Sequence, residues 1–142
     1  MNRITNALNL KPGSVLYDLG AGDGKIVFRM ASPTVKAVAI ESNPYLVILM
    51  HCRRLFHPHK QQITIIWQDL FQADLKTATD IYLFVGPFLI NQIVNNILTK
   101  PHQKLKKIVS YRYCPKEKGF VKFDKQEFPI YVLNFKTKSA RP

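Results

Sequence analysis

An apolar segment that runs directly into three closely spaced glycines constrains the fold of this chain more than any other feature. Residues 15–19 read Val-Leu-Tyr-Asp-Leu, residues 20–24 read Gly-Ala-Gly-Asp-Gly, and apolar side chains resume at Ile26. Glycine permits a sharp turn and a close approach of the backbone to a ligand because it has no Cβ atom. The pattern predicts a strand, a glycine turn and a helix whose first N–H groups face a ligand.

The spacing and charge of this turn separate two classes of nucleotide cofactor. A dinucleotide-binding turn, G-x-G-x-x-G, would need glycine at position 25, where the chain has Lys25. The carboxylates of Asp18 and Asp23 would repel a pyrophosphate and attract a ligand that carries an ammonium group. The turn therefore favours S-adenosylmethionine, which carries an ammonium and a sulfonium, over a dinucleotide. The alternative is a tight turn that binds no ligand.

Apolar segments spaced along the rest of the chain predict an alternating α/β fold. Helical periodicity is expected from the glycine turn to residue 31, over 46–55 and over 90–98. The stripe over 46–55 consists of Leu46, Val47, Leu49, Met50, Arg53 and Leu55. The expected strands are 14–19, 36–40, 63–67, 79–85, 107–111, 120–123 and 130–135. Too few residues separate the last two strands for a crossover helix, so these strands should be antiparallel. We expect one domain, residues 1–142, with a doubly wound Rossmann-like sheet that is mostly parallel.

The acidic residues gather where the first three expected strands end. The chain has only nine acidic residues against 21 lysines and arginines, yet Asp18, Asp23, Glu41 and Asp69 all fall at these strand ends or in the loops that follow. Ligands of open α/β sheets bind at the carboxyl ends of the strands. The clustering therefore predicts a cofactor site at this edge.

Longer motifs carry a resemblance to a known family. Residues 18–24, D-L-G-A-G-D-G, resemble the first motif of class I S-adenosylmethionine-dependent methyltransferases. The segments 17–27, 39–47 (A-I-E-S-N-P-Y-L-V), 67–75 (W-Q-D-L-F-Q-A-D-L) and 110–113 (S-Y-R-Y) resemble a protein-lysine methyltransferase family. That family includes archaeal broad-specificity lysine enzymes and the mitochondrial enzyme that acts on the ATP synthase c-subunit. The similarity covers about residues 12–113, and the helical segment that these relatives place before the first strand is almost absent here.

The resemblance implies a role for each motif residue. Asp18 and the glycine-turn backbone would hold the methionine part of the cofactor, and Glu41 would accept hydrogen bonds from both ribose hydroxyls. Asp69 would bind the adenine amino group, with the Leu70 N–H on a ring nitrogen. The alternative for each acid is a helix cap or a salt bridge. The residues assigned to S-adenosylmethionine and its product S-adenosylhomocysteine are Asp18, Gly20, Ala21, Gly22, Gly24, Glu41, Ser42, Asp69 and Leu70.

The methyl acceptor is less constrained. Enzymes that methylate adenine or glutamine amides typically carry D/N-P-P-Y/F after the fourth strand, whereas residues 84–88 here read Phe-Val-Gly-Pro-Phe. The resemblance instead implies transfer to a protein lysine, and the candidates for orienting its amine are Tyr45, Gly86, Tyr111 and Tyr113. Two alternatives remain open: an RNA methyltransferase, and a cofactor-binding domain without catalytic activity.

Charge is concentrated in the C-terminal third. The net charge is +12, and from Lys100 onward the chain has twelve basic residues against three acidic ones. We expect a protein substrate that is acidic or membrane-associated, with RNA as the alternative partner. The longest apolar run, 81–90, contains Gly86-Pro87, so no membrane insertion is expected, and without a signal peptide the expected location is cytoplasmic.

Few residues suggest other chemistry. Cys52 and Cys114 are too few for a disulfide framework and are expected to be reduced. His51, Cys52, His57 and His59 are close in sequence, but Pro58 interrupts the run and no metal is expected. The sequence leaves the oligomeric state open.

Overall fold

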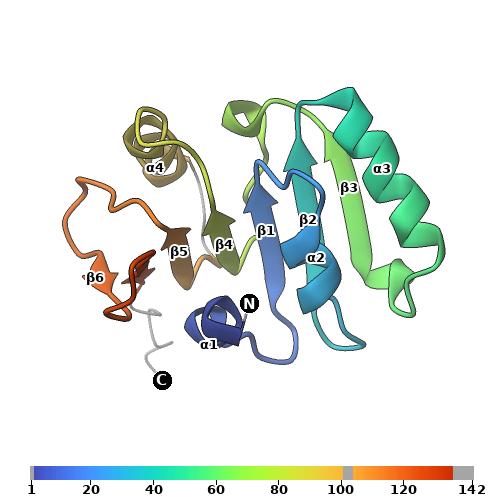
Figure 1. The fold of residues 1–142 in the computed structure, drawn as a ribbon, viewed down its shortest axis with the longest axis horizontal. Helices are drawn as coiled ribbons and strands as arrows, with labels where there is room; N and C mark the ends of the chain where they lie inside the picture. The colour runs from blue at the N-terminus through green and yellow to red at the C-terminus, as the bar shows by residue number, and fades with distance from the viewer. Residues whose placement is uncertain (1, 101–103, 136–142) are drawn as a thin grey trace, which may run out of the picture.

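The computed structural model describes residues 2–100 and 104–135, which form helices and strands in alternation (Figure 1). In chain order the elements are α1 (Asn2–Leu8), β1 (Val15–Leu19), α2 (Lys25–Met30), β2 (Lys36–Glu41), α3 (Pro44–Leu55), η1 (Lys60–Gln62), β3 (Ile63–Trp67), η2 (Leu70–Gln72), β4 (Asp80–Leu83), α4 (Ile90–Thr99), β5 (Lys107–Tyr111), β6 (Val121–Lys122) and β7 (Ile130–Asn134). The elements η1 and η2 are single turns of 3₁₀ helix.

The strands form one seven-stranded sheet in the order β3-β2-β1-β4-β5-β7-β6. Strands β1 to β5 are parallel, and β7 is antiparallel to both of its neighbours. The predicted fold class is therefore confirmed: the sheet is mostly parallel with antiparallel pairing at its C-terminal end. The five parallel strands end at the same edge of the sheet, the upper one in Figure 1.

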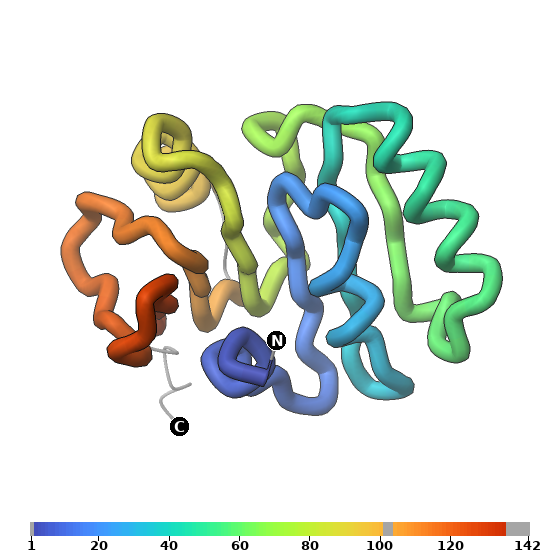
Figure 2. Tube along the Cα trace, in the orientation of Figure 1, coloured from blue at the N-terminus to red at the C-terminus, as the bar shows by residue number. Residues whose placement is uncertain are grey.

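Both faces of the central strands are buried, which explains their continuous apolar sequence. The face that carries Leu19 and Leu83 packs against the apolar side of α4. The opposite face packs against α1 and α2 at its centre, and around Val47 and Met50 of α3 at the β2–β3 end. The tube in Figure 2 shows how the turns that follow β1, β2 and β3 rise from this framework to one common edge.

Helix α1 was not expected from the sequence, because the helical segment that the related enzymes place before the first strand is almost absent in this chain. Its residues Ile4 and Leu8 are buried against the sheet. The Nζ atom of Lys107 on β5 donates hydrogen bonds to the carbonyl oxygens of Ala7 and Leu8, at 3.2 and 2.7 Å. A strand lysine thus satisfies carbonyl groups at the C-terminus of α1 that the helix itself leaves unpaired.

The connection between β3 and β4 differs from the other crossovers. It contains only η2 and a loop, so the described chain has no α-helix between these two parallel strands. As a result, the β1–β3 side of the sheet carries a groove of about 450 Å³ on the face of Val38 and Ile66. The predicted alternation of strands and helices is wrong at this one step.

The apolar stripe predicted for α3 is only partly buried. The helix begins at Pro44, earlier than expected, and the Asn43 side chain caps it by accepting a hydrogen bond from the Tyr45 N–H. Its buried side chains are Val47 and Met50, whereas Leu55, a member of the expected stripe, is 66% exposed. No helix in the described part of the chain has the length and apolar character needed to cross a bilayer.

Candidate active site

The glycine turn after β1 is held in place by the end of β2. The N–H groups of Gly20 and Ala21 both donate to the carbonyl oxygen of Ile40, at 2.9 and 3.0 Å. Gly20, Gly22 and Gly24 have φ angles of 82°, 59° and 78°, a left-handed conformation that favours glycine. A Cβ atom placed on Gly22 would meet no atom within 4 Å, so the backbone at this position borders open space.

Glu41, at the end of β2, connects two loops. Its Oε2 atom accepts a hydrogen bond from the Gly22 N–H and its Oε1 atom accepts one from the Asn43 N–H, both at 2.8 Å. A carboxylate has about four acceptor sites, so each oxygen retains capacity for a ligand hydroxyl. The neighbouring Ser42 is exposed, and its carbonyl oxygen accepts a hydrogen bond from the Trp67 indole N–H at 2.9 Å. Glu41 is therefore held in a fixed orientation beside the glycine turn.

Asp18 lies beneath the turn on β1 and is 2% exposed. Burial raises the pKa of its carboxyl group to about 8, and the charges of Glu41 and Asp23 act in the same direction. All three causes penalise the carboxylate form. A positively charged ligand group placed here would lower this pKa and stabilise the charged form.

Asp23, inside the turn, was expected from the sequence to attract the ligand, but in the structure it lies beside two cations. Its carboxylate lies 3.6 Å from Nη1 of Arg53 on α3 and 3.7 Å from Nζ of Lys25. The Arg53 guanidinium also lies 4.9 Å from the centroid of the Phe28 ring. Asp23 thus links the glycine turn to α3, and two cations compensate the charge that was expected to attract the ligand.

Asp69 follows β3 and caps η2. Its Oδ1 atom accepts a hydrogen bond from the Phe71 N–H at 2.9 Å, which is the alternative role considered from the sequence, and its side chain remains exposed. The Gln68 N–H donates to the Glu41 carbonyl oxygen at 3.0 Å, so the ends of β2 and β3 are joined. The Leu70 side chain lies on the Gly20 side of the site, 3.8 Å from a Cβ placed on Gly20. The predicted cofactor residues therefore gather on three adjacent strands; their contacts with a cofactor stay a prediction.

The four residues predicted to orient the acceptor do not form one cluster. Tyr45 is 80% exposed on α3, which follows β2. Tyr111 ends β5, and two strands separate β5 from β2, a distance of roughly 14 Å at about 4.8 Å per strand. The Gly86 carbonyl oxygen accepts hydrogen bonds from the Leu89 and Ile90 N–H groups at 3.0 and 3.2 Å, and so serves the start of α4. The predicted role of Gly86 in orienting an amine stays a prediction.

Two aromatic side chains, Phe84 and Phe88, lie after β4. Neither was assigned a role from the sequence. Phe84 is 50% exposed, and its ring lies 5.2 Å from that of Tyr111 in an edge-on arrangement. Phe88, in the loop before α4, is 89% exposed. The only sequence signal for this exposed aromatic loop is the pair Pro87-Phe88 directly after a buried strand. In the sequence, this pair indicates only that the segment departs from the D/N-P-P-Y/F motif.

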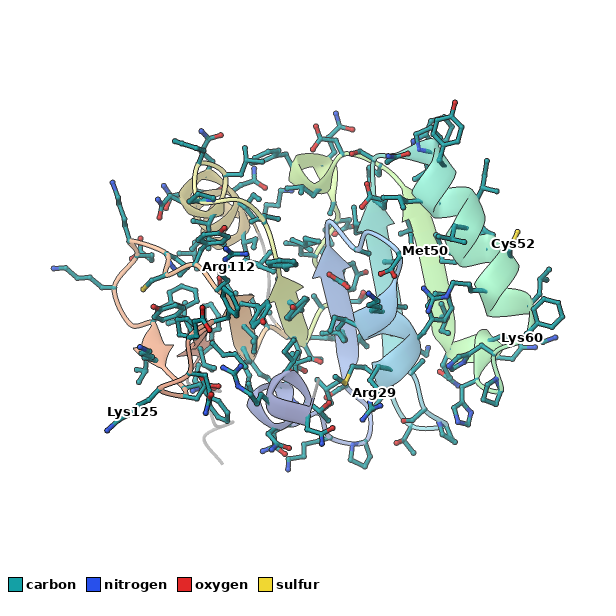
Figure 3. All side chains as sticks on the ribbon, viewed as in Figure 1. Arg29, Met50, Cys52, Lys60, Arg112 and Lys125 are labelled. Carbon is teal, nitrogen blue, oxygen red and sulfur yellow. The ribbon has the colours of Figure 1, made fainter. Side chains whose placement is uncertain are left out.

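Arg112, after β5, is a second residue that the sequence does not single out. It has a φ of 74°, and its guanidinium lies 5.5 Å from the Tyr113 ring centroid and 4.8 Å from that of Phe128. The Lys116 N–H donates to Oδ1 of Asn91 on α4 at 2.7 Å. The loop after β5 therefore lies against the helix that follows the aromatic loop, and Figure 3 shows Arg112 near the upper ends of β4 and β5.

The histidine-rich segment after α3 has a structural role. The Nε2–H of His57 donates a hydrogen bond to the Phe28 carbonyl oxygen at 2.9 Å, and its Nδ1 accepts one from the His59 N–H at 3.1 Å. Among residues 2–100 and 104–135, no three histidine, cysteine, aspartate or glutamate side chains converge in a way that would hold a metal ion.

Comparisons with known proteins agree on the class of enzyme. The family model described as "ANTKMT methyltransferase domain" matches residues 18–117, a range that contains all the predicted site residues. A probable ribosomal RNA small subunit methyltransferase A from Methanosarcina barkeri is 40% identical over 53 residues, which are 37% of this chain and 18% of that protein. An rRNA adenine N-6-methyltransferase from Clostridium perfringens is 27% identical over 125 residues, or 86% of this chain and 47% of the relative. The chain thus spans less than half the length of these curated relatives.

A solved structure resembles almost the entire chain. It is an RNA methyltransferase from Salinibacter ruber in complex with S-adenosyl-L-homocysteine, and it superposes with a TM-score of 0.83 at 25% sequence identity. The match covers 94% of this chain and 88% of the other.

Proposed function

The chain belongs to the ANTKMT methyltransferase domain family, and we propose that it transfers a methyl group from S-adenosylmethionine to RNA. Its sheet is that of a class I methyltransferase, and S-adenosylmethionine is its cofactor. The strand ends fit this ligand. Asp18 is buried and forms no ion pair within the part of the chain that the structure describes. Glu41 is held in place with acceptor sites to spare, and the backbone at Gly22 borders open space.

The cofactor, when bound, supplies an electrophilic methyl group on a sulfonium. The chain's own contribution is binding and alignment, which are sufficient to accelerate a direct displacement. Asp18 would bind the ammonium group as a carboxylate and so release the proton that it holds near neutral pH. Glu41, fixed by two backbone N–H groups, would hold the ribose without reorienting.

The exposed aromatic loop after β4 is the observation that carries the RNA proposal. Phe88 is 89% exposed and Phe84 is 50% exposed beside Tyr111, at the edge where the acceptor must approach. Proteins that read single-stranded RNA stack unpaired bases on such aromatic side chains. A base stacked on Phe88 would lie in the loop that directly follows β4.

Basic side chains next to this loop support the same acceptor. Arg112, Lys116 and Lys118 are exposed in the segment after β5, which contacts the start of α4. Residues 104–135 contain eight basic and three acidic residues, a net charge of +5. These cations could bind RNA phosphate groups on the same side of the site as the aromatic loop. The ribosomal RNA relatives and the Salinibacter RNA methyltransferase point in the same direction.

A methyl-labelling experiment tests the proposal. The purified protein is incubated with methyl-labelled S-adenosylmethionine and either total RNA or total protein from cells, and the product is digested with nuclease or protease before counting. We expect the label to enter RNA and to be released by nuclease. Label that enters only protein would contradict the RNA proposal, and no label in either fraction would favour a cofactor-binding domain without activity.

Two phenylalanines with the same exposed fraction provide a matched control. Phe88 and Phe56 are both 89% exposed, but Phe56 lies at the far end of α3. Losing one stacked base should cost about 1 to 3 kcal/mol, so Phe88→Ala should lower the methylation rate at low RNA concentration roughly five- to 150-fold. Phe56→Ala should leave that rate unchanged, and both variants should bind S-adenosylhomocysteine as the wild type does.

Transfer to a protein lysine is the second candidate. It is favoured by the resemblance of the motifs at 39–47, 67–75 and 110–113 to a protein-lysine methyltransferase family. A lysine with a reference pKa of about 10.4 is almost entirely protonated at neutral pH and must lose a proton before it can attack. Burial beside a sulfonium would lower that pKa, and the Phe84 and Tyr111 rings offer π faces to the cation as it arrives. The basic surface would then select acidic or membrane-associated proteins. Protease-sensitive label in the experiment above would establish this candidate instead.

A further inference from the structure

The outward side of α3 is apolar along its whole length. Because residues three and four apart share one side of a helix, these side chains form a continuous band opposite buried Val47 and Met50. We call it the α3 stripe; it consists of Tyr45, Ile48, Leu49, Cys52, Leu55 and Phe56, the last of which directly follows the helix. Figure 3 shows Cys52 pointing away from the sheet and Met50 on the side toward it.

The α3 stripe is exposed where a surface helix normally carries polar side chains. Ile48 is 61% exposed, Leu55 is 66% exposed and Phe56 is 89% exposed. A contiguous exposed apolar patch of this kind marks a surface that binds another apolar surface. The site already described does not use Ile48, Cys52, Leu55 or Phe56.

The surroundings of the stripe are basic. Between Glu41 and Asp69 the chain has no acidic residue, whereas it has Arg53, Arg54 and Lys60. Arg53 is paired with Asp23, which leaves Arg54 and Lys60 as the cations next to the C-terminal half of the stripe.

A groove joins the cationic and apolar groups. It has a volume of about 400 Å³ and is lined by His51, Cys52, Arg54, Leu55, Lys60 and Gln61. The Arg54 Nε–H donates to the Lys60 carbonyl oxygen at 3.0 Å, which holds the turn after α3 against the helix. The basic side chains of Arg54 and Lys60 therefore line the same groove as stripe residues Cys52 and Leu55.

We propose that α3 docks on the surface of a bilayer that contains anionic lipids, with the α3 stripe among the acyl chains and lipid phosphates at the basic groove. Charge complementarity favours this occupant: a net charge of +12 attracts an anionic surface but repels a second copy of the same chain. Aromatic and aliphatic side chains flanked by cations are the pattern of helices that lie in a membrane interface. The twelve residues of α3 span roughly 18 Å, less than the roughly 30 Å of a hydrocarbon core, so the helix lies on the membrane and does not cross it.

Vesicle flotation tests the apolar part of the proposal. The full chain is mixed with vesicles of phosphatidylcholine alone or of phosphatidylcholine with phosphatidylglycerol, and we expect it to float only with the second. Leu55→Ser combined with Phe56→Ser should weaken partitioning about 100-fold, since two large apolar side chains no longer enter the membrane. Val121→Ser combined with Phe123→Ser, which alters exposed apolar side chains near β6, should weaken it less than threefold.

A matched pair of charge reversals tests the basic part. Lys60→Glu and Lys125→Glu change the net charge equally, but only Lys60 lines the groove. Lys60→Glu should weaken partitioning roughly 30-fold, and Lys125→Glu only a few-fold. Equal effects of the two would mean that the net charge alone drives binding, which would overturn the assignment of the groove.

A fluorescent probe keeps the proposal testable if the variants fold poorly. The two cysteines are free and exposed, so an environment-sensitive fluorophore can be attached to Cys52 in a Cys114→Ser background or to Cys114 in a Cys52→Ser background. Anionic vesicles should shift the emission at Cys52 to the blue and leave that at Cys114 unchanged. No shift at either position, a Cys52 shift caused by RNA and not by vesicles, or a concentration-dependent dimer that masks Cys52 without lipid would each overturn the proposal.

Discussion

Binding of the cofactor should depend steeply on pH through Asp18. Burial, with the charges of Glu41 and Asp23, raises the pKa of the Asp18 carboxyl group to about 8 when no ligand is present. The ammonium group of the ligand requires the carboxylate. Binding must therefore remove a proton that the free protein holds at pH 6 to 7, and Asp18→Asn removes this requirement together with the attractive charge.

The magnitude follows from the fraction of protein that is already ionised. With a pKa of about 8, roughly one Asp18 carboxyl group in ten is ionised at pH 7 and one in a hundred at pH 6. The apparent affinity is reduced by the competent fraction, so it should fall about tenfold between pH 7 and pH 6. About one proton should be released for each ligand bound in this range. Asp18→Asn should bind more weakly at pH 7 and lose the pH dependence.

The same shift has a consequence for stability, with a definite sign. Between pH 4 and pH 8 the folded protein holds a proton on Asp18 that the unfolded chain releases, so the ligand-free protein should lose stability as the pH rises. From pH 4 to pH 7 the loss from this one group is on the order of 4 kcal/mol at 1.36 kcal/mol per pKa unit. Asp18→Asn should therefore melt at a higher temperature than the wild type at pH 7 while binding the ligand more weakly.

Isothermal titration calorimetry with S-adenosylhomocysteine measures both quantities. Titrations at pH 6 and pH 7, each in two buffers with different ionisation enthalpies, give the affinity and the number of protons released. Asp18→Asn in the same buffers accounts for any protons that come from the ligand. An affinity that is equal at both pH values, or a proton release that persists in Asp18→Asn, would refute the reasoning.

Three further changes should have distinct effects. Glu41→Ala should weaken S-adenosylhomocysteine binding roughly ten- to 150-fold, because a charged acceptor is worth about 1.5 to 3 kcal/mol, and unchanged affinity by calorimetry would remove Glu41 from the site. Gly24→Ala should lower the free energy of unfolding by about 2 kcal/mol or more, because φ is 78° and the new Cβ would lie 2.7 Å from the Phe28 ring. Gly22→Ala adds strain but no clash, so denaturant melts should show about half that loss, and equal losses would contradict this account. Lys116→Gln with Lys118→Gln should flatten the salt dependence of RNA binding by about 0.7 log units per tenfold salt for each phosphate that is no longer neutralised, and an unchanged slope would place the RNA elsewhere.

Much of the fold could be predicted because periodicity and turn residues agreed along the chain. Strands β3 and β5 begin and end where the sequence placed them, and β7 differs by one residue. Helix α1 was missed because seven residues are too few to show a clear helical period, and because it is stabilised by packing on β5 and β7. The helix α3 was predicted, but its exposed side was not. An apolar residue at helical spacing, such as Leu55, looks the same in sequence whether it faces the core or the solvent.

The cofactor side of the site was more predictable than the acceptor side for a physical reason. Asp18, the glycine turn and Glu41 are placed by adjacent parallel strands, so sequence position determines their location. The acceptor side depends on loop conformation. The Gly86 carbonyl oxygen is used by the start of α4, and Arg112 adopts a positive φ that places it over two aromatic rings. Neither arrangement follows from residue type or spacing.

The contact between Lys107 and α1 also bears on when α1 can dock while the chain is being synthesised on the ribosome. Lys107 and Leu8 are 99 residues apart in sequence, and a seven-residue helix is too short to persist alone. At about 5 to 20 residues per second, translation needs roughly 5 to 20 s to supply the lysine after Leu8 has been added. Until then, Ile4 and Leu8 lack the neighbours that β5 and β7 provide in the folded protein. The segment that is made before β1 is thus among the last to dock, and nascent chains should keep it accessible to chaperones until β5 has left the exit tunnel.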